Sequence, residues 1–422
     1  MATVEKRRWE GGAGAPTRRD RLSCDYSVYL PDRVAGRTFA LDGDVAAEVA
    51  DAEAEIVRLD ASATALAGTE ALARLLLRAE SVASSRIEGL EVGGRRLLRA
   101  DAARRAGETV RDVTAIEVLG NIEAMAWCVG EASEGRSFAL QTLLEAHRRL
   151  VAGTRLDRYG GWVRDVQNWI GGSDFNPCSA AFVPPPPEAV PGLLEDLIAF
   201  CNEDSLPAVA QAAIAHAQFE TIHPFVDGNG RAGRALVHVV LRRRGLAPRV
   251  LPPVSLVLAT WPDEYVAGLS ATRYVGDSHA QEARTGINRW VAFFAAACRR
   301  AAEDAARFEQ RVRRLQESWR ERIAPVRRDS AARLLIDVLP GAPVLTTTTA
   351  AKAIGRSYQS TSQAVGRLAA AGILRQVAMG RRNRAFESPE LLAEFTSLER
   401  QLASPGGDTR ISTPERPVPR RS

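Results

Sequence analysis

The sequence predicts a mainly α-helical protein. Apolar residues recur three and four positions apart over most of the chain, as on one face of a helix, and strand-like alternation is confined to short regions. Two such helical segments flank a glycine-rich stretch at residues 223–234, and basic residues followed by Gly245 mark the end of the second one. We therefore expect a helix, a tight glycine loop and a second helix at the centre of a helical core.

Length and composition set the outer limits. The chain has 422 residues, of which 45% are hydrophobic and 25% charged, which suits two or three domains with real cores. The net charge of +5 is too mild to indicate nucleic acid by itself. Five scattered cysteines without a CxxC pair predict a reduced, cytoplasmic protein with neither a disulfide framework nor a zinc site. No secretory or membrane-spanning segment is recognised, so no membrane partner is expected.

The N-terminal part divides into a tail and a helical segment. Residues 1–24 are rich in glycine, arginine and charge, and we expect them to be disordered. Residues 25–105 should contain one helix over 44–66 and another that begins after Gly68 and ends in SSRIEG. In that ending Gly89 can terminate the helix, and Glu88 opposes the helix dipole by roughly 0.3–1 kcal/mol. The glutamate is either a solvated surface residue or one that a cation from elsewhere compensates.

Residues 106–300 form the predicted core. Helices are expected over 110–129, 141–151 and 188–202, and we interpret His147, on the second of them, as a packed or surface histidine and not as a ligand. Between the last two, residues 163–170 and 180–183 alternate roughly and enclose a glycine turn, which predicts a β-hairpin.

The stretch from His223 to Arg234 reads HPFVDGNGRAGR, and its residue types suit a polyphosphate and a divalent metal. Glycine N–H groups and the N-terminus of the following helix can approach oxyanions, arginines neutralise them, and a carboxylate can hold the metal. A dinucleotide-binding fold is excluded because a helix, not a strand, precedes the glycines; a Walker loop is excluded because no Gly-Lys-Ser/Thr follows. His216 and His223 are roughly 10 Å apart along a helix, too far to share one ion.

The C-terminal part should contain a connecting helix, residues 301–328, and a separate domain, residues 329–400. Three short helices and a strand–turn–strand in that domain resemble a winged helix-turn-helix, and the region from 357 to 386 is basic and free of acids. Its arginines suit DNA phosphates and a polar run can reach base edges: Arg367, Arg375, Arg381, Arg382 and Arg384, and Ser357, Gln359, Ser360, Thr361 and Gln363. A domain used only for protein contacts is an equal alternative. Residues 401–422 are expected to be disordered.

The stretch HPFVDGNGRAGR matches the signature HPFx(D/E)GNGRxxR of Fic-domain proteins, which are mostly protein AMP-transferases that use ATP and Mg²⁺. The resemblance implies a helical Fic core in which the hairpin is a flap that holds a target peptide. It also implies roles for signature residues: His223 as general base, Asp227 as the Mg²⁺ ligand, and an ATP site formed by Gly228, Asn229, Gly230, Arg231 and Arg234.

The ending SSRIEG resembles the inhibitory helix of Fic proteins, (S/T)xxxE(G/N), with Ser84, Glu88 and Gly89 at the matching positions. In that family the glutamate pairs with the second signature arginine, here Arg234, and so removes donors that hold the γ-phosphate. The resemblance implies an autoinhibited enzyme that transfers AMP to a hydroxyl of a protein substrate and of itself. Removal of AMP at the same site, or a DNA-binding regulator that senses a nucleotide, are the alternatives, and whether the chain forms a homodimer stays open.

Overall fold

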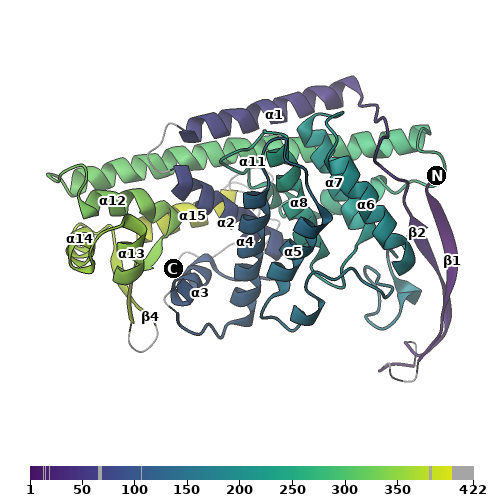
Figure 1. Ribbon diagram of the computed structural model, residues 1–422, viewed down its shortest axis with the longest axis horizontal. Coiled ribbons are helices and arrows are strands. Elements are labelled where there is room, and N and C mark those ends of the chain that lie inside the picture. Colours follow the sequence, from purple (N-terminus) through teal and green to yellow (C-terminus); the bar gives the residue numbers. More distant parts are fainter. Residues whose placement is uncertain are drawn as a thin grey trace. The chain divides into compact units, whose positions relative to one another are not determined.

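A computed structural model describes residues 1–12, 14, 16–18, 20–64, 69–105, 107–379 and 383–401, and it is mainly helical, as expected (Figure 1). The chain packs as two compact units. Unit one consists of Met1–Asp51, Trp127–Leu246 and Asp263–Ala296, and unit two consists of Ala52–Ala126, Ala247–Pro262 and Ala297–Ser422. Of the described helices, α1 (Gly43–Thr64), α4 (Val113–Glu131) and α11 (Gln281–Arg322) contribute several residues to each unit.

Unit one is built around α7 (Ala208–Ile222) and α8 (Asn229–Arg243), the two helices expected on either side of the glycine loop. Every residue of α7 is buried, which its small and apolar composition allows. Gly233 permits the close approach of the two helices, because a Cβ there would lie 2.6 Å from Glu220 Oε1. The other elements of the unit are β1 (Thr3–Trp9), β2 (Cys24–Leu30), α5 (Leu140–Val151), α6 (Val190–Cys201), α10 (Pro262–Ala271) and 3₁₀ turns at Asp157–Tyr159, Pro177–Ser179 and Pro187–Ala189.

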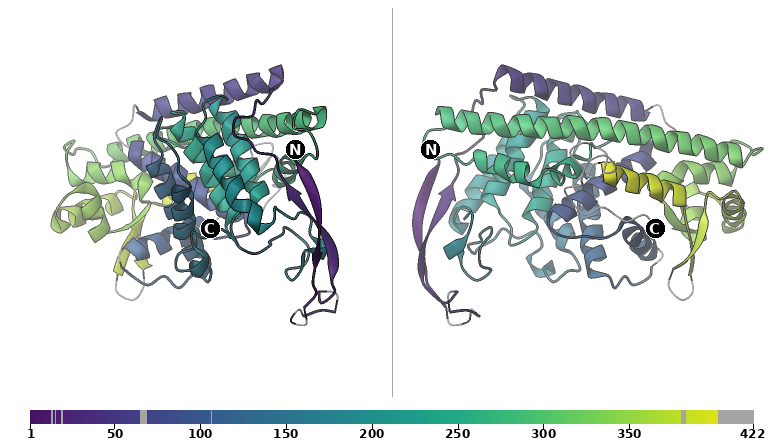
Figure 2. Two further views of the ribbon diagram at one scale, coloured as in Figure 1. Left: turned by 45° about the vertical axis from the view of Figure 1, so that its right-hand side comes forward. Right: turned by 180° about the vertical axis from the view of Figure 1, so that it is seen from behind.

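The N-terminus forms a two-stranded ribbon, so the expectation of a disordered tail over residues 1–24 is wrong for β1. The strands β1 and β2 pair antiparallel, with Thr3 opposite Leu30 and Trp9 opposite Cys24 (Figure 2). Composition missed the ribbon because distant residues hold it. Trp9 packs edge-on against Trp169 at a ring distance of 5.5 Å, and Cys24 forms a disulfide with Cys178. This disulfide also corrects the expectation that all five cysteines are reduced; the other three are free and buried.

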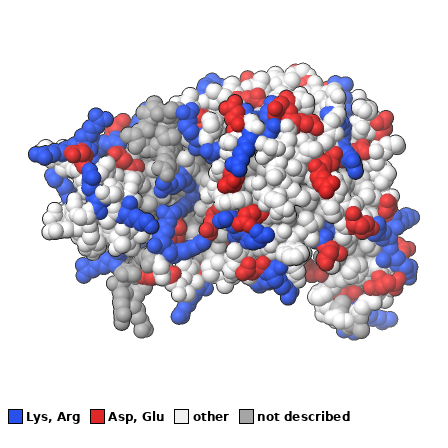
Figure 3. Space-filling view, in the orientation of Figure 1, with Lys and Arg blue, Asp and Glu red and all other residues white. Residues whose placement is uncertain are grey.

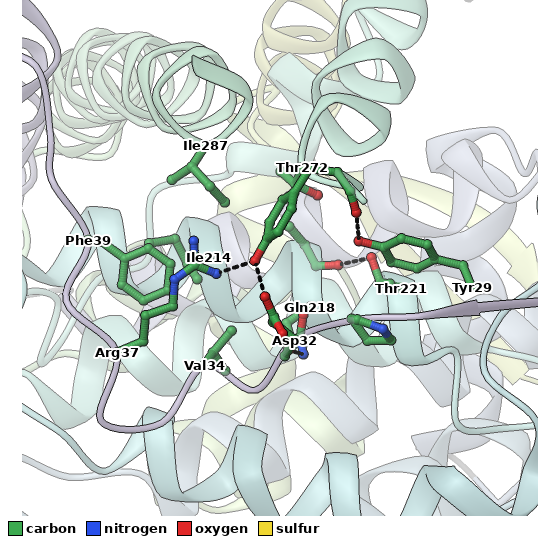
Figure 4. A pocket seen from close by; sticks show the side chains of 13 residues that line it. Tyr29, Asp32, Val34, Arg37, Phe39, Ile214, Gln218, Thr221, Thr272 and Ile287 are labelled. Carbon is green, nitrogen blue, oxygen red and sulfur yellow. Dashed lines mark hydrogen bonds between the residues drawn. The ribbon is translucent and has the colours of Figure 1, made fainter. Parts of the chain in front are cut away.

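The segment after β2 is fixed to α7 by a polar cluster that lines a small pocket (Figure 4). The Tyr274 hydroxyl accepts a hydrogen bond from Arg37 and donates one to Asp32, both at 2.7 Å. Gln218 of α7 donates to the Asp32 carbonyl at 2.9 Å. Burial raises the pKa of Tyr274 far above its usual value, so the hydroxyl stays a donor. The lining of this pocket includes Ile214, Ala217, Gln218 and Thr221 of α7 and no residue of the stretch 223–234.

The expected β-hairpin over 163–183 is reduced to one bridge, between Ile170 and Phe182. Gly171 and Gly172 make the turn with φ of +73° and +78°, as the sequence suggests. A longer ladder does not form because the first arm uses its backbone elsewhere: the Arg164 N–H donates to the Pro224 carbonyl at 2.9 Å. We refer to residues 163–183 as the flap segment.

Unit two contains the N-terminal helices and the C-terminal elements. A shared hydrophobic core connects the N-terminal helices with the C-terminal elements, since Leu98 and Ala102 of α3 pack with Val344, Ala385 and Leu392. The elements are α2 (Thr69–Ile87), α3 (Gly94–Arg105), α9 (Val254–Leu258), α12 (Ala331–Val338), β3 (Val344–Thr346), α13 (Thr347–Ile354), α14 (Tyr358–Ala370), β4 (Arg375–Met379), β5 (Asn383–Glu387), α15 (Pro389–Gln401) and a 3₁₀ turn at Leu339–Gly341.

Each helix and strand expected between 329 and 387 is present, and a strand that was not expected, β3, completes a sheet of order β3-β5-β4. Ser330, Thr346 and Ser357 cap the three helices by accepting hydrogen bonds from backbone N–H groups. Arg381, Arg382 and the tail beyond residue 401 lie outside the described residues. The name winged helix-turn-helix stays a prediction.

The described residues include one helix, α4, that is long and apolar enough to cross a membrane by length and composition. Half of its most apolar window is buried in the structure, and Ala115, Val118 and Leu119 pack into a core with Val82 and Leu97. These contacts are those of a core helix.

Candidate functional site

His223 ends α7 in a left-handed backbone conformation, with φ of 50° and ψ of 61°. It is the one non-glycine residue with positive φ in the part of the chain that the structure describes. A residue with a Cβ pays roughly 1–2 kcal/mol for this geometry, so the surrounding structure has to impose it. The conformation turns the chain sharply out of the helix and into the glycine loop.

The side chain of Arg164 imposes that turn. Its guanidinium, in a residue that is 3% exposed, donates only to backbone carbonyls: His223 at 2.8 Å, Pro185 at 2.6 Å, Val166 at 3.0 Å and Ile222 at 3.3 Å. The last carbonyls of α7 have no partner within the helix and form the negative end of its dipole, so a cation is favoured there. Burial lowers the pKa of Arg164 to about 10, which leaves it charged at neutral pH.

Two amide side chains orient the imidazole of His223. The Asn229 nitrogen lies 3.1 Å from Nδ1, and its direction is fixed because Asn229 also bonds the N–H and the carbonyl of Phe225, both at 2.8 Å. The Asn168 nitrogen, from the flap segment, lies 2.9 Å from Nδ1. Since an amide nitrogen donates, Nδ1 accepts in this arrangement and the neutral ring carries its proton on Nε2.

His147 holds the loop from the other side. Its ring stacks on Phe225 at 3.8 Å, Nδ1 accepts from the Gly161 N–H at 3.0 Å, and Nε2 donates to the Asp227 carbonyl at 3.0 Å. Burial lowers its pKa to about 4, so it is neutral at physiological pH. Of the two expected alternatives, a packed or a surface histidine, the structure shows the packed one, and His147 packs against the loop itself.

The glycine loop presents the N-terminus of α8. Gly228 adopts φ of 78°, where a Cβ would lie 3.0 Å from Leu150, and its carbonyl accepts from the Ala232 N–H at 3.0 Å. The N–H groups of the first turn have no acceptor within the helix, which makes this end an anion site. The Asn229 side chain is 2% exposed and closes the loop, and its expected contact with ATP stays a prediction.

The signature cations are buried at this helix end. Arg231 approaches Asp227 Oδ1 at 3.4 Å, and its Nε is buried without a hydrogen-bond partner among the described residues. A buried guanidinium N–H without an acceptor is able to donate a hydrogen bond to an anion. Arg234 is 2% exposed. The pKa of neighbouring His216 is lowered to about 3, mainly because His216 is buried and secondly because of the charge of Arg234.

Asp227 is the exposed carboxylate of the site, with 46% of its side chain accessible, and Oδ1 accepts the Gly228 N–H. No cluster of three metal-ligating side chains occurs within residues 1–401 where they are described. One carboxylate can still bind Mg²⁺ together with substrate phosphates, which is the usual arrangement for this ion.

The structure brings one group of predicted site residues together within unit one, whereas the inhibitory residues belong to unit two. His223, Asp227, Gly228, Gly230, Arg231 and Arg234 share the loop and the first turns of α8 in unit one. The inhibitory residues Ser84, Glu88 and Gly89 lie at the end of α2 in unit two, where Gly89 and Leu90 donate to the carbonyls of Arg86 and Ser85. The pairing of Glu88 with Arg234 stays a prediction.

Sequence reasoning missed Arg164, Asn168 and the contact made by His147. Arg164 lies in a stretch of rough alternation that reads as a strand, where an arginine is expected to face water. Asn168 could have been noticed because it is a polar residue in the expected flap, which should lie beside His223. The contact itself could not be predicted, because the two residues are 55 positions apart in the sequence.

This fold and site define a helical protein in which a glycine loop and the N-terminus of a helix lie beside a fixed histidine. Residues 46–129 match the N-terminal region of the Fic/DOC family, and residues 137–241 match the Fic/DOC family itself. These two matches confirm, over those residues, the resemblance seen in the signature.

Curated relatives share part of this region. Protein adenylyltransferase fic-1 of Caenorhabditis briggsae is 30% identical over 212 residues, which are 49% of this chain and 39% of the relative. Protein adenylyltransferase Fic of Drosophila grimshawi is 34% identical over 140 residues, which are 32% of this chain and 27% of that protein. The chain thus spans well under half the length of these relatives.

A crystal structure of a Fic family protein from Desulfovibrio desulfuricans G20 has the same fold. It superposes with a TM-score of 0.50 at 21% identity and covers 83% of this chain and 97% of its own.

The role of Arg164 can be tested by Arg164→Gln. Loss of the cation removes the guanidinium donors from the buried carbonyls of Ile222 and Pro185 and leaves the His223 carbonyl with Asn168 alone, so the free energy of unfolding should fall by on the order of 3 kcal/mol. The matched control is Arg155→Gln, at an exposed position in the same unit, which should leave stability within about 0.5 kcal/mol of the starting value. Thermal or urea unfolding measures both. Equal stability of the two variants would contradict the proposed clamp.

Proposed function

We propose that the chain transfers AMP from ATP to a Ser, Thr or Tyr hydroxyl of a protein, including its own. One observation carries the proposal: a buried arginine with an unsatisfied N–H and the free N-terminus of α8 lie beside an imidazole whose ring is fixed. This arrangement fits a triphosphate held next to a base. The relatives that share the Fic region are named protein adenylyltransferases, which supports the same activity.

The proposed division of labour follows from position. The N–H groups of Gly230 and Arg231, in the first turn of α8, hold inner phosphate oxygens, and the guanidinium groups of Arg231 and Arg234 hold the outer ones. Fixing the outer phosphates aligns the bond from the α-phosphorus to its leaving oxygen with the attacking hydroxyl. The hydroxyl oxygen forms the new bond to the α-phosphorus as pyrophosphate leaves, and His223 takes the hydroxyl proton.

Asp227 is the residue that would hold Mg²⁺, because it is the exposed carboxylate of the loop. When bound, the ion would neutralise charge on the phosphates. The backbone of Asp227 is fixed independently by His147, so its carboxylate stays at the mouth of the loop.

A base at Nε2 requires the resting proton of His223 to reside on Nδ1 instead. Asn168 offers a means, because its Oδ1 is buried without a described hydrogen-bond partner. A half-turn of that amide brings Oδ1 to Nδ1, where Oδ1 accepts a hydrogen bond from Nδ1–H; this loses the contacts from the amide nitrogen to the carbonyls of His223 and Phe225 at 3.2 and 3.1 Å. The ring must also move away from the fixed Asn229 nitrogen, which donates to the same Nδ1. We therefore include Asn168 as a positioning residue that sets the tautomer.

His223→Ala should abolish transfer of labelled AMP from ATP, with a loss of more than about a hundredfold, because no other group can accept the hydroxyl proton there. His279→Ala changes an exposed histidine of the same unit and should keep full activity. Labelling by the His223 variant at the control's level would overturn the assignment. If the unsubstituted protein removes AMP from a modified target but transfers none from ATP, the reverse reaction is favoured instead.

Substitutions at Asn168 test its effect on the ring. Asn168→Ala should lower kcat by roughly tenfold with little change in KM for ATP, because the ring loses a contact and the phosphate site does not. Asn168→Asp should move the acidic limb of the kcat profile to higher pH, because a carboxylate stabilises the imidazolium. Profiles of kcat against pH decide the question; a purely structural role predicts unchanged profiles in both variants.

We also propose that Glu88 restrains the enzyme by pairing with Arg234, as the family resemblance implies. The end of α2 is well fixed for such a role: the buried amide of Asn121 donates to the Ser81 carbonyl at 2.8 Å and to the Ser85 hydroxyl at 3.0 Å. A glutamate on a fixed helix end loses little conformational entropy when it binds a cation.

Glu88→Gly should raise self-modification several-fold, since it frees the donors that hold the outer phosphate. Glu91→Gly removes a neighbouring exposed carboxylate and serves as the control with equal change in charge. Autoradiography after incubation with labelled ATP compares them. If the Glu88 variant labels no more strongly than the control, autoinhibition by this residue is refuted.

A further inference from the structure

The elements α13 and α14 form a helix–turn–helix with a polar outer face. The helix α13 ends at Gly355, whose φ is 62°, and Ser357 caps α14 two residues later. Such a three-residue turn with glycine is typical of motifs that present their second helix to a DNA groove. One side of α14 is buried through Thr361, Ala364, Val365 and Leu368, and α14 packs on α12 and α13.

Burial changes the set of candidate contacts. Thr361 is fully buried and donates to the Ser357 carbonyl at 2.9 Å, so it cannot reach a base edge. Arg375 forms an ion pair at 2.5 Å with the buried carboxylate of Glu387, so the charge of Arg375 is neutralised within the protein. The exposed face of α14 contains Gln359, Ser362, Gln363, Gly366 and Arg367.

The charge around this face has one sign. The sequence from 338 to 386 contains no Asp or Glu, and the exposed Lys352, Arg356, Arg367 and Arg384 make no ion pair with any described residue. Arg356 and Arg367 touch only the backbone carbonyls of Asp329 and Pro325, at 3.4 Å. In the region of these helices Figure 3 shows basic side chains together with some acidic ones.

Acids on neighbouring elements are mostly paired with arginines and so do not cancel this charge. These ion pairs are Asp337 with Arg320, Glu387 with Arg375, Glu390 with Arg322 and Glu394 with Arg311. The acid left beside the face is exposed Asp329, next to Arg356.

Gly366 is informative because it has no structural reason to be glycine. A Cβ there would meet nothing within 4 Å, yet glycine inside a helix costs about 1 kcal/mol relative to alanine. A bare backbone in the middle of the exposed face allows close approach of another surface.

From these observations we propose that this face binds double-stranded DNA. Gln359, Ser362 and Gln363 occupy the N-terminal half of α14, where amide and hydroxyl groups read base edges in the major groove. Lys352, Arg356 and Arg367 surround them and contact phosphates. Double-stranded RNA does not suit the face, because its major groove is too narrow for a helix. The inference concerns unit two and is independent of AMP transfer.

The test measures binding of the full chain to a fluorescein-labelled random-sequence duplex of about two helical turns, by anisotropy at several salt concentrations. The triple variant Lys352→Ala, Arg356→Ala, Arg367→Ala should weaken binding at least tenfold and reduce the salt slope by about three. A control with the same loss of charge in the same unit, Arg58→Ala, Arg104→Ala, Arg314→Ala, should retain both.

A second variant, Gly366→Glu, separates binding from folding. The structure has room for the side chain and helix propensity improves, so stability should not fall, whereas the added carboxylate should repel DNA. Gly130→Glu, at another exposed helical glycine with open space, should leave binding intact. The proposal is overturned if the duplex does not bind, if the two triple variants lose affinity equally, or if RNA binds more tightly than DNA.

Discussion

The site depends on one buried cation at the end of one helix. Arg164 donates to the carbonyls of residues 222 and 223, of Val166 in the flap segment and of Pro185 just after it, so it both caps α7 and ties the flap segment to it. This capping explains why His223 can occupy a left-handed conformation that no glycine relieves. Without Arg164 its hydrogen bonds would no longer offset the backbone strain at His223, and the imidazole would lose the position from which it can act.

The loop divides its polar groups between internal and external partners. Asn229, His147 and the carbonyl of Gly228 bond within the protein and make the loop rigid. Arg231 Nε and the first N–H groups of α8 are left for a ligand. Binding an anion at such a site costs little ordering free energy, because the site already has its bound shape. The end of α2 is ordered beforehand in the same way, because Asn121 holds it in place.

Several misjudged features share one cause, namely contacts between residues far apart in sequence. The ribbon β1–β2 looked disordered because its composition is charged, but Trp169 and Cys178 hold it. The hairpin looked longer because alternation cannot show that Arg164 bonds to Pro224. The helices α3, α9 and α15 were not predicted, and α3 is stabilised by packing on the C-terminal sheet. On α14 periodicity located the helix, but only burial showed that Thr361 faces inward.

The sequence by itself determined the helix–loop–helix and the chemistry of its twelve-residue stretch, because helical periodicity, glycine at a turn and buried charge are local properties. It also determined the end of α2 at Gly89 and the helices and strands between 329 and 387. The tertiary structure alone decided which groups hold the histidine and which remain for a ligand. Hydrogen bonding is satisfied in three dimensions, and an arginine 59 residues away from His223 can do what no neighbour in the chain can reach.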